Sequence, residues 1–408
     1  MTSAAVAVTG VGLLTPARIG SRDTFDGLCS GRSTAAIDPD LQGAPVDFSC
    51  AVPDFRAQEA LGRRLAHRMD RFTQLAVLAA REAVTDAGLR TDEWLPERVG
   101  VVLGTASSSM EALPTDMGHY LSGHPERISP MSLTRSLPSA PVAEVTIALG
   151  ARGPSFSVSN ACAAGNQAIA LGVDLLRSRS CDIVIAGGAE SPRTLCCAIL
   201  LGRLRALSRR RDRPESASRP FDAERDGLVI GEGAGVLVLE RQEHAHARGV
   251  VPRALLAGHG STSDAHHYVA PEPEGHGAEA AMRAALADAG LRPVDIDHVN
   301  AHATSTTVGD LAEARALNRL FRNDVPPVTA PKSLIGHSLG AAGAVESAIT
   351  VMTLQHQRIP PTANLERLDP AIALDVVHKG PRDTRMRAAL SNSFAFGGHN
   401  TVLVFTTG

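Results

Sequence analysis

Lysine, aromatic residues and a net charge of either sign are all scarce in this 408-residue sequence. Basic and acidic residues number 40 and 43, so they nearly cancel and the formal net charge is -3. Nucleic-acid-binding proteins usually carry a positive field, so we expect no nucleic-acid partner. Hydrophobic residues make up 44% of the chain, which excludes a disordered protein and suffices for one large core or two fused cores.

Cysteines paired at metal-binding or disulfide-type spacings are also missing. The six that occur are Cys29, Cys50, Cys162, Cys181, Cys196 and Cys197. Their spacing predicts neither a zinc site nor a disulfide framework, as is typical of a reduced compartment. No stretch reaches the roughly 18 apolar residues that span a bilayer, and no basic leader precedes the N-terminal apolar run. We expect a cytoplasmic protein with no membrane contact.

The chain does contain an internal repeat. The pentapeptide DAGLR occurs at 86–90 and again at 288–292, each time after a segment with helical apolar spacing. In both copies a strand ending in small and hydroxyl residues follows, and the glycine suits a left-handed helix stop. Further strands and a small-residue turn before an apolar helix recur in the same order, which favours a duplicated fold.

Strands rich in Val, Ile and Leu alternate with helices in both halves, which predicts buried and mostly parallel sheets covered by helices. We place the boundary near residue 250, giving halves 1–250 and 251–408. Because ligands of such α/β folds gather beyond the carboxyl ends of the strands, the strand-end motifs of both halves should converge on one site.

Cys162 lies in such a turn, between an apolar FSV run and a long apolar helix. We expect the helix start to stabilise a thiolate, lower the pKa of the thiol and so make Cys162 a nucleophile. The alternative is a buried cysteine that acts as a small hydrophobe, which is how we interpret the other five.

Two histidines have comparable settings in the second half. His302 ends a strand in NAHATST, and His337 precedes the apolar helix that corresponds to the cysteine helix. A neutral imidazole there could donate to a developing oxyanion. Lys332, one of only two lysines, lies five residues before His337. Near the C-terminus, the glycine-rich turn at 392–400 could expose backbone amides as an oxyanion hole, or could simply be a tight turn.

Together these motifs resemble the β-ketoacyl-acyl-carrier-protein synthases, of the synthase II type, over essentially the whole chain. The matching segments are ACAAG at 161–165, PFDAERDGLVIGEGAG at 220–235, NAHATST at 300–306, KSLIGHSLGAAGAVE at 332–346 and NSFAFGG at 392–398. The resemblance implies the thiolase fold, a duplicated five-layered α/β/α/β/α structure. It also implies an acyltransferase that condenses malonyl-carrier protein with a cysteine-bound acyl chain, for fatty-acid or, more in keeping with this sequence, specialised polyketide synthesis.

The resemblance assigns roles to particular residues. Cys162 would carry the acyl chain, and its amide and that of Phe396, which also gates the pocket, would form the oxyanion hole. His302 and His337 would assist decarboxylation, with Lys332 and Glu313 supporting them. The phosphopantetheine arm would bind Thr304 and Thr306. No metal or other cofactor is implied, since the substrates ride on the carrier protein's phosphopantetheine.

The acyl carrier protein is the expected partner. It is acidic, so Arg68, Arg205 and Arg209 would dock it, although the arginine run could equally be a solvated loop. A homodimer or a heterodimer with a chain-length-factor homologue is expected, through the sheets of the first half.

Some positions depart from the family pattern. The segment TASSSM at 105–110 replaces a glycine-rich one in which a bulky residue often limits the pocket, so we expect Ser107 or Ser108 to open or polarise the acyl channel. Ala163 and Ala164 replace Thr-Ser, and Ala395 replaces a glycine. A noncatalytic chain-length factor is the main rival, but such partners usually lack the cysteine. A degradative thiolase would carry a second cysteine near the C-terminus, and none follows Cys197.

Overall fold

One mixed sheet organises the chain in the computed structural model, which describes residues 5–107 and 109–408. Within these residues, ten strands follow one another across the sheet in the order β11-β10-β14-β15-β9-β1-β8-β7-β5-β6, and β2 (Arg18–Ile19) pairs with β1. The first-half strands are β1 (Val6–Thr15), β5 (Val99–Gly104), β6 (Ser155–Val158), β7 (Ile183–Glu190) and β8 (Gly233–Arg241). The second-half strands are β9 (Ala254–Ser263), β10 (His298–Asn300), β11 (Val328–Thr329), β14 (Ala388–Ala395) and β15 (His399–Thr406).

The two halves of this sheet have the same topology. Reading outward from the joint between β1 and β9, the first half runs β1-β8-β7-β5-β6 and the second runs β9-β15-β14-β10-β11. Each position is filled by the corresponding strand of its half, with parallel pairing at the outer end and antiparallel pairing near the joint. The prediction of mostly parallel sheets is therefore wrong, because the pairings from β7 to β14 across the joint are antiparallel. The duplication predicted from the sequence is therefore confirmed at the level of strand order.

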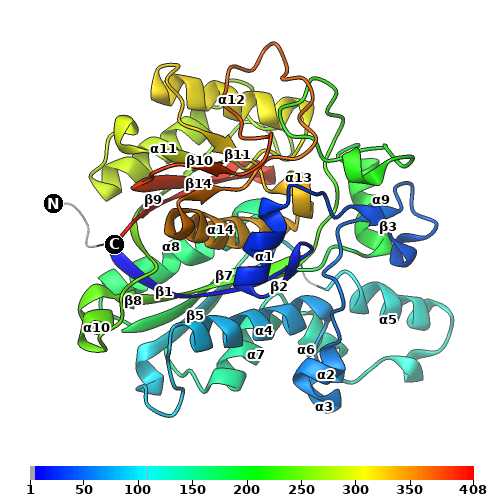
Figure 1. Cartoon of the computed structure of the whole chain (residues 1–408). Helices are drawn as coiled ribbons and strands as arrows, with labels where there is room; N and C mark the ends of the chain where they lie inside the picture. The colour runs from blue at the N-terminus through cyan, green and yellow to red at the C-terminus, as the bar shows by residue number, and fades with distance from the viewer. Residues whose placement is uncertain (1–4, 108) are drawn as a thin grey trace.

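Helices cover both half-sheets and also separate them, which makes five layers (Figure 1). The central layer contains α8 (Ala164–Arg177) and α14 (Ala342–His356), which contact strands of both half-sheets. The outer layers contain α4 (Arg71–Asp86) and α7 (Ala140–Leu149) on one side and α11 (His276–Ala289) and α12 (Thr307–Phe321) on the other. This arrangement is the predicted five-layered fold.

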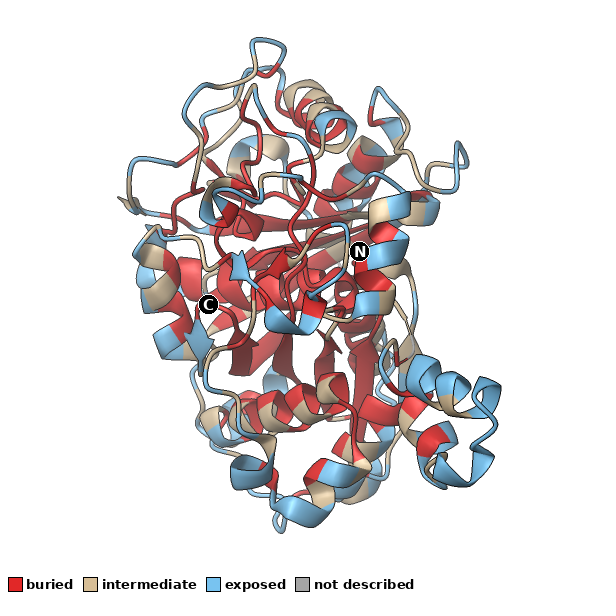
Figure 2. Ribbon diagram, turned by 90° about the vertical axis from the view of Figure 1, so that its right-hand side faces the viewer, coloured by how far each residue is buried: buried red, intermediate tan, exposed pale blue. Residues whose placement is uncertain are grey.

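The composition of the central helices explains their position. α14 is buried all round from Ala342 to Leu354, as a helix enclosed between two sheets must be. A Cβ on Gly165 of α8 would lie 2.6 Å from the backbone nitrogen of Ala344, so the two helices cross closely only because this residue is glycine. The red core in Figure 2 runs through these layers and leaves the exposed residues to the outer helices and loops.

Both copies of DAGLR end their helices as predicted. Gly88 after α4 and Gly290 after α11 have φ values of +62° and +69°. Such left-handed residues stop a helix and release the chain toward the next strand.

An excursion of the first half follows β5 and contains α5 (Ala112–Leu121) and α6 (Ser132–Ser136). The other short elements include α1 (Ser21–Cys29), α2 (Ala57–Leu61), α3 (Arg63–Arg68), α9 (Leu195–Arg203), α10 (Gln242–Ala247), α13 (Lys332–Ile335), and the strand pairs β3 (Ala36–Ile37) with β4 (Phe48–Ser49) and β12 (Arg358–Ile359) with β13 (Arg382–Asp383). Over the part of the chain that the structure describes, no helix has the length and apolar character needed to cross a membrane.

Candidate active site

Cys162 lies in the turn between β6 and α8, where the sequence places it. A single 3-10 turn over Ala161–Ala163 precedes α8, and Ala161 adopts a left-handed φ of 46°. This strained backbone carries the sulfur to the boundary between the two halves. The thiol is buried, and its Sγ lies 3.1 Å from Nε2 of His337. A cysteine of one half and a histidine of the other thus form one pair.

The expected direction of the Cys162 pKa shift is wrong. Burial raises the pKa of this thiol from 9.0 to about 11. The positive charge of Lys332 and the backbone amides of Phe396 and of Cys162 itself, both directed at the sulfur, lower the pKa but do not offset the desolvation of a thiolate. Cys162 is therefore a protonated thiol at neutral pH, and a base must remove its proton when it reacts.

His337 can act as that base. Its backbone is fixed by strand-like pairing with Ile230: the His337 amide donates to the carbonyl of Val229 at 2.8 Å, and its carbonyl accepts from Gly231 at 3.0 Å. Burial holds the pKa of this imidazole well below its ordinary 6.5, and the charge of Lys332 lowers it further. A neutral ring can accept a proton at Nε2 and return it later.

His302 lies beside His337 at the end of β10, with the ring centroids 5.5 Å apart and nearly perpendicular. Burial again lowers its pKa well below 6.5, and Lys332 adds to the effect. The Lys332 ammonium lies 3.4 Å from His302 Nδ1 and donates to the His302 carbonyl at 2.6 Å. The lysine thus orients this ring and disfavours its protonation.

Glu346 is the counter-ion of Lys332, a role that the sequence did not reveal. Its Oε1 accepts from the ammonium at 2.6 Å, and both side chains are only 2% exposed. Burial raises the pKa of Glu346 to about 7, and the lysine opposes this. Glu346 lies inside the motif segment 332–346, but only the packing of α14 against β10 shows which carboxylate the lysine meets.

Glu313 supports the site in a different way. From α12, its two oxygens accept from the amides of His302 and Ala303 at 2.9 and 2.8 Å, and Oε1 also accepts from Asn392. It holds the backbone of the histidine turn, whereas the ammonium of Lys332 donates to Glu346. The sequence placed Glu313 in the supporting network without identifying these partners.

A cavity of about 350 Å³ leads to Cys162 from the surface. Its lining includes both histidines, Thr304, Thr306 and Phe396, so all of these predicted residues meet there. The hydroxyls of Thr304 and Thr306 lie 3.0 Å apart, which gives an extended polar chain two neighbouring groups to bind. Phe394 packs against His302 at the same place and was not singled out from the sequence.

The predicted docking arginines differ in availability. Arg205 is exposed and lines the mouth of the cavity, and Arg209 is exposed on the loop that follows it. Arg68, at the end of α3, is half-buried and forms an ion pair with Glu144. A carrier protein would have to compete with that carboxylate for Arg68.

Ser107 points toward Glu190 at the end of β7. Its hydroxyl donates to Glu190 at 3.2 Å, and Thr105 Oγ1 and the Ala106 amide donate to the same carboxylate at 2.9 and 2.5 Å. Burial raises the pKa of Glu190 to about 7. Ser108 lies outside the described residues. Ala106 and Met110 pack against the apolar cluster that contains Cys162, so this turn borders the space around the nucleophile.

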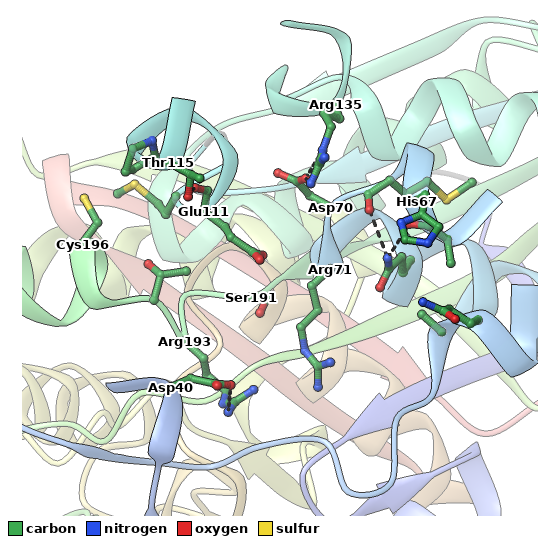
Figure 3. Close-up of a pocket in the computed structure, with 18 of the residues that line it drawn as sticks. Asp40, His67, Asp70, Arg71, Glu111, Thr115, Arg135, Ser191, Arg193 and Cys196 are labelled. Atoms are coloured by element: carbon green, nitrogen blue, oxygen red, sulfur yellow. Dashed lines mark hydrogen bonds and ion pairs between the residues drawn. The ribbon is translucent and has the colours of Figure 1, made fainter. Parts of the chain in front are cut away.

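A second cavity, of about 880 Å³, lies beyond this turn (Figure 3). Met110, Ser191 and Cys196 are among its lining residues. Several of its charged groups are paired: Arg135 with Asp70, and Arg71 and Arg193 with Glu232. Among the residues that the structure places, no group of three or more His, Cys, Asp or Glu side chains is arranged to hold a metal ion.

The sequence matches the family models for the Beta-ketoacyl synthase N-terminal domain over residues 3–245 and C-terminal domain over residues 253–366. The chain belongs to the β-ketoacyl synthase family. This β-ketoacyl synthase is 38% identical over 406 residues to the 3-oxoacyl-[acyl-carrier-protein] synthase 2 of Staphylococcus aureus, covering 98% of this chain and 97% of that one.

Two solved structures are also similar to this β-ketoacyl synthase. Each covers 100% of both chains with a TM-score of 0.93: a β-ketoacyl synthase from Burkholderia phymatum at 35% identity and the ishigamide ketosynthase/chain length factor at 34%. The protein is therefore a condensing acyltransferase with the thiolase fold, as the motifs indicated.

Proposed function

We propose that this protein catalyses the decarboxylative Claisen condensation of malonyl-carrier protein with an acyl chain held on Cys162. The observation that carries the proposal is the 3.1 Å contact between Cys162 Sγ and His337 Nε2, with His302 and Lys332 beside it. The division of labour follows the two halves: residues 1–250 supply the nucleophile, and residues 251–408 supply the two histidines and the lysine.

The first step transfers the acyl chain to the protein. As Cys162 Sγ attacks the carbonyl carbon of the acyl-carrier thioester, its proton moves to Nε2 of His337. The amides of Cys162 and Phe396, which point at the sulfur, stabilise the tetrahedral oxyanion. The carbon–sulfur bond to pantetheine then breaks, and the departing thiolate takes the proton from His337.

The second step makes the carbon–carbon bond. When the malonyl thioester loses CO₂, the electron pair of the broken bond forms an enolate. Its oxygen accepts hydrogen bonds from the neutral rings of His302 and His337, each of which carries its proton on Nε2 at this step. The enolate carbon attacks the acyl thioester on Cys162, and the cysteine sulfur leaves as a thiolate, which takes a proton from solvent. Lys332 and Glu346 hold His302 in place without adding a net charge, and Glu313 fixes its backbone.

This chemistry requires no metal or redox cofactor, because the electrons that form the new bond come from decarboxylation. Both substrates arrive on the phosphopantetheine of an acyl carrier protein, whose arm we place along Thr304 and Thr306. Arg205 and Arg209 would meet the acidic carrier at the cavity mouth, with Arg68 as a further contact.

The partner surface lies on the first half. Phe156 on the outermost strand β6 is 45% exposed, and Tyr120 and Leu121 of α5 are 62% and 76% exposed. A partner that continues the sheet from β6 would cover these apolar side chains. We propose a dimer formed here, with a second copy or with a chain-length-factor homologue.

We further propose a specialised polyketide pathway over a housekeeping fatty-acid pathway. The serines after β5 replace a bulky wall residue of the family pattern, and Ser107 with Glu190 adds polar groups beside the acyl chain. The similar ishigamide ketosynthase/chain length factor supports this choice. A noncatalytic chain-length role is the alternative, but the intact Cys162, His302 and His337 favour catalysis.

Intact-protein mass spectrometry tests the proposal. The protein is incubated with carrier proteins bearing saturated, unsaturated or aromatic acyl groups, and the adduct is mapped by peptide sequencing. We expect one acyl group, on Cys162. An adduct elsewhere would contradict the nucleophile assignment, and no adduct from any donor, with or without a chain-length factor, would favour a noncatalytic role.

A further inference from the structure

The turn that carries His302, Thr304 and Thr306 is not self-supporting. Ser305, between the two threonines, has a left-handed φ of 69° although it is not glycine, and it is fully buried. A non-glycine residue keeps such a backbone only when its surroundings impose it. The groups that hold this turn therefore decide where its side chains point.

α12 holds the turn with a carboxylate. Asp310 Oδ1 accepts from the Ser305 amide at 3.0 Å, and Oδ2 accepts from the Phe221 amide at 2.8 Å. The Ser305 hydroxyl in turn accepts from the Arg219 amide at 2.9 Å, and the Ser305 carbonyl accepts from the Gly227 amide at 3.1 Å. Segment 219–228 thus lies against the turn along its length.

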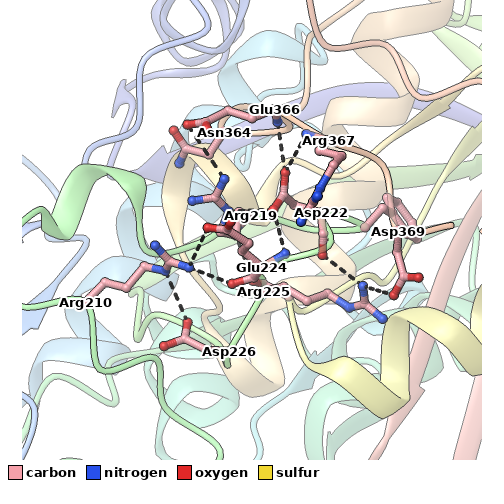
Figure 4. A network of polar contacts seen from close by, with 12 residues as sticks. Arg210, Arg219, Asp222, Glu224, Arg225, Asp226, Asn364, Glu366, Arg367 and Asp369 are labelled. Atoms are coloured by element: carbon pink, nitrogen blue, oxygen red, sulfur yellow. Dashed lines mark hydrogen bonds and ion pairs between the residues drawn. The ribbon is translucent and has the colours of Figure 1, made fainter.

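The turn is also held by the guanidinium of Arg225, whose side chain is 1% exposed and whose Nε lies 3.6 Å from Oδ2 of Asp310. Its Nε donates to the Thr306 carbonyl at 3.2 Å and its Nη2 to the Thr307 carbonyl at 2.8 Å. Its Nη1 donates to Asp369 at 2.7 Å, which fixes the guanidinium from behind (Figure 4). One buried cation binds two successive carbonyls at the start of α12.

The opposite edge of the same segment holds the exposed arginine loop. Ser208 Oγ donates to Asp226 at 2.6 Å, the Leu228 amide donates to the Ala206 carbonyl at 2.9 Å, and Arg210 Nη2 donates to the Glu224 carbonyl at 2.7 Å. One short segment therefore touches both the arginine loop and the threonine turn.

We propose that Arg225 is a positioning residue for the pantetheine-binding turn, and that segment 219–228 sets the distance from the docking arginines to that turn. A pantetheine arm has a fixed length, so a carrier protein docked on Arg205 and Arg209 can deliver its thioester only if this distance is fixed. The inference rests on the proposed function and assigns roles to Arg225 and Ser208.

Three probes of increasing size separate the levels of this proposal. The rate of alkylation by iodoacetamide depends on the reactivity of Cys162 alone. Acyl transfer from octanoyl-pantetheine depends also on binding of pantetheine at the Thr304–Thr306 turn. Acyl transfer from an octanoyl-loaded carrier protein depends in addition on docking of that protein. For Arg225→Lys we expect KM for both thioesters to rise by about tenfold, because lysine cannot bind two carbonyls at once. The alkylation rate of Cys162 should stay within about twofold of the wild type, since the cysteine is held by other elements.

Arg219→Lys is the matched control. Arg219 belongs to the same network and its side chain is 4% exposed, but that side chain pairs with Asp222 and Glu366 and does not bond the turn. It should lower the melting temperature without raising either KM. If Arg225→Lys does not fold, Asp369→Asn replaces it, because that residue is 20% exposed and acts only through Arg225 and the start of its own loop.

Ser208→Ala tests the other edge. It should raise KM for the octanoyl-carrier protein and leave KM for octanoyl-pantetheine unchanged. Equal KM changes in the Arg225 and Arg219 variants, or a parallel loss of alkylation in the Arg225 variant, would overturn the positioning role. A Ser208 variant that affects both thioesters equally, or neither, would overturn the spacing role. If the wild type takes octanoyl from neither thioester, the proposed function itself fails.

Discussion

The strand-end turns after β5 and β10 occupy equivalent places in the duplicated fold but are held in different ways. The turn after β5 depends on one buried carboxylate, Glu190, which binds three successive residues. The turn after β10 is held by Glu313, Asp310 and the guanidinium of Arg225. The turn to which we assign proton transfer is thus fixed by several charged groups, whereas the turn that we propose borders the acyl chain is held by one.

The chain beyond each turn shows the same contrast. After β10 it enters α12 at once, whereas after β5 it makes the excursion through α5 and α6 before α7. One scaffold therefore supports a rigid site for groups that every substrate shares and a less constrained wall for the part that differs between substrates. Four predictions, in order of expected size, test this division.

Separating condensation from malonyl decarboxylation should have the largest effect. Cys162→Ala should lower condensation by at least about 10³-fold, since the nucleophile is lost. Cys162→Gln should retain or raise malonyl decarboxylation, because the histidines of the second half remain. Release of CO₂ and formation of the condensed product are measured in parallel. Acyl-enzyme formation by the alanine variant would refute the assignment of the nucleophile.

Breaking the charged support of the second half comes next. Lys332→Met leaves Glu346 buried without a partner, which should cost about 3–5 kcal/mol of unfolding free energy, and condensation should fall by roughly 100-fold as His302 loses its orienting group. The double variant Lys332→Met/Glu346→Gln should regain most of the stability but not the activity. Recovery of activity in the double variant would show that Lys332 is only structural.

Glu190, the carboxylate that holds the turn after β5, should make the stability of the protein depend on pH. The folded pKa of Glu190 is about 7 against an ordinary 4.5, so the folded protein binds a proton that the unfolded chain has released between these values. Its contribution is complete below pH 4.5 and falls by about 3 kcal/mol as the pH rises to about 7. Urea unfolding of the wild type and Glu190→Gln at several pH values should show the wild type losing stability relative to the variant. Parallel curves would contradict the shift.

The smallest effect should come from the threonine hydroxyls that we propose bind pantetheine. Thr304→Val removes one hydrogen bond of about 1 kcal/mol, so KM for an acyl-pantetheine should rise about fivefold with kcat nearly unchanged. Thr91→Val is a control in an exposed turn outside the cavity that Thr304 lines. A fall in kcat with KM unchanged would place Thr304 closer to the chemistry than we propose.

The sequence predicted those features that follow from local pattern and order. The repeat, the layer arrangement and the turns of Cys162, His302 and His337 could be inferred because each depends on a short motif and its place beside a strand. The glycines after α4 and α11 ended their helices for the same reason.

Features that depend on burial or on distant partners could not be predicted. The pKa of Cys162 is raised and not lowered as the sequence predicts, because desolvation of the thiolate outweighs the nearby amides and Lys332. Glu346 and Glu190 acquire their partners only when α14 and β7 pack beside other strands. The sequence predicts Arg68 as a docking residue but does not reveal that Glu144, distant in sequence, pairs with it.

The joint between the half-sheets has the symmetry of a contact between two identical units. β1 and β9 each have ten residues, and Val6, Ala7 and Val8 pair with Leu256, Leu255 and Ala254. The first residue of either strand thus meets the third of the other, and the second meets the second, as across a two-fold axis. This is the geometry of an isologous contact, in which one surface binds its own copy.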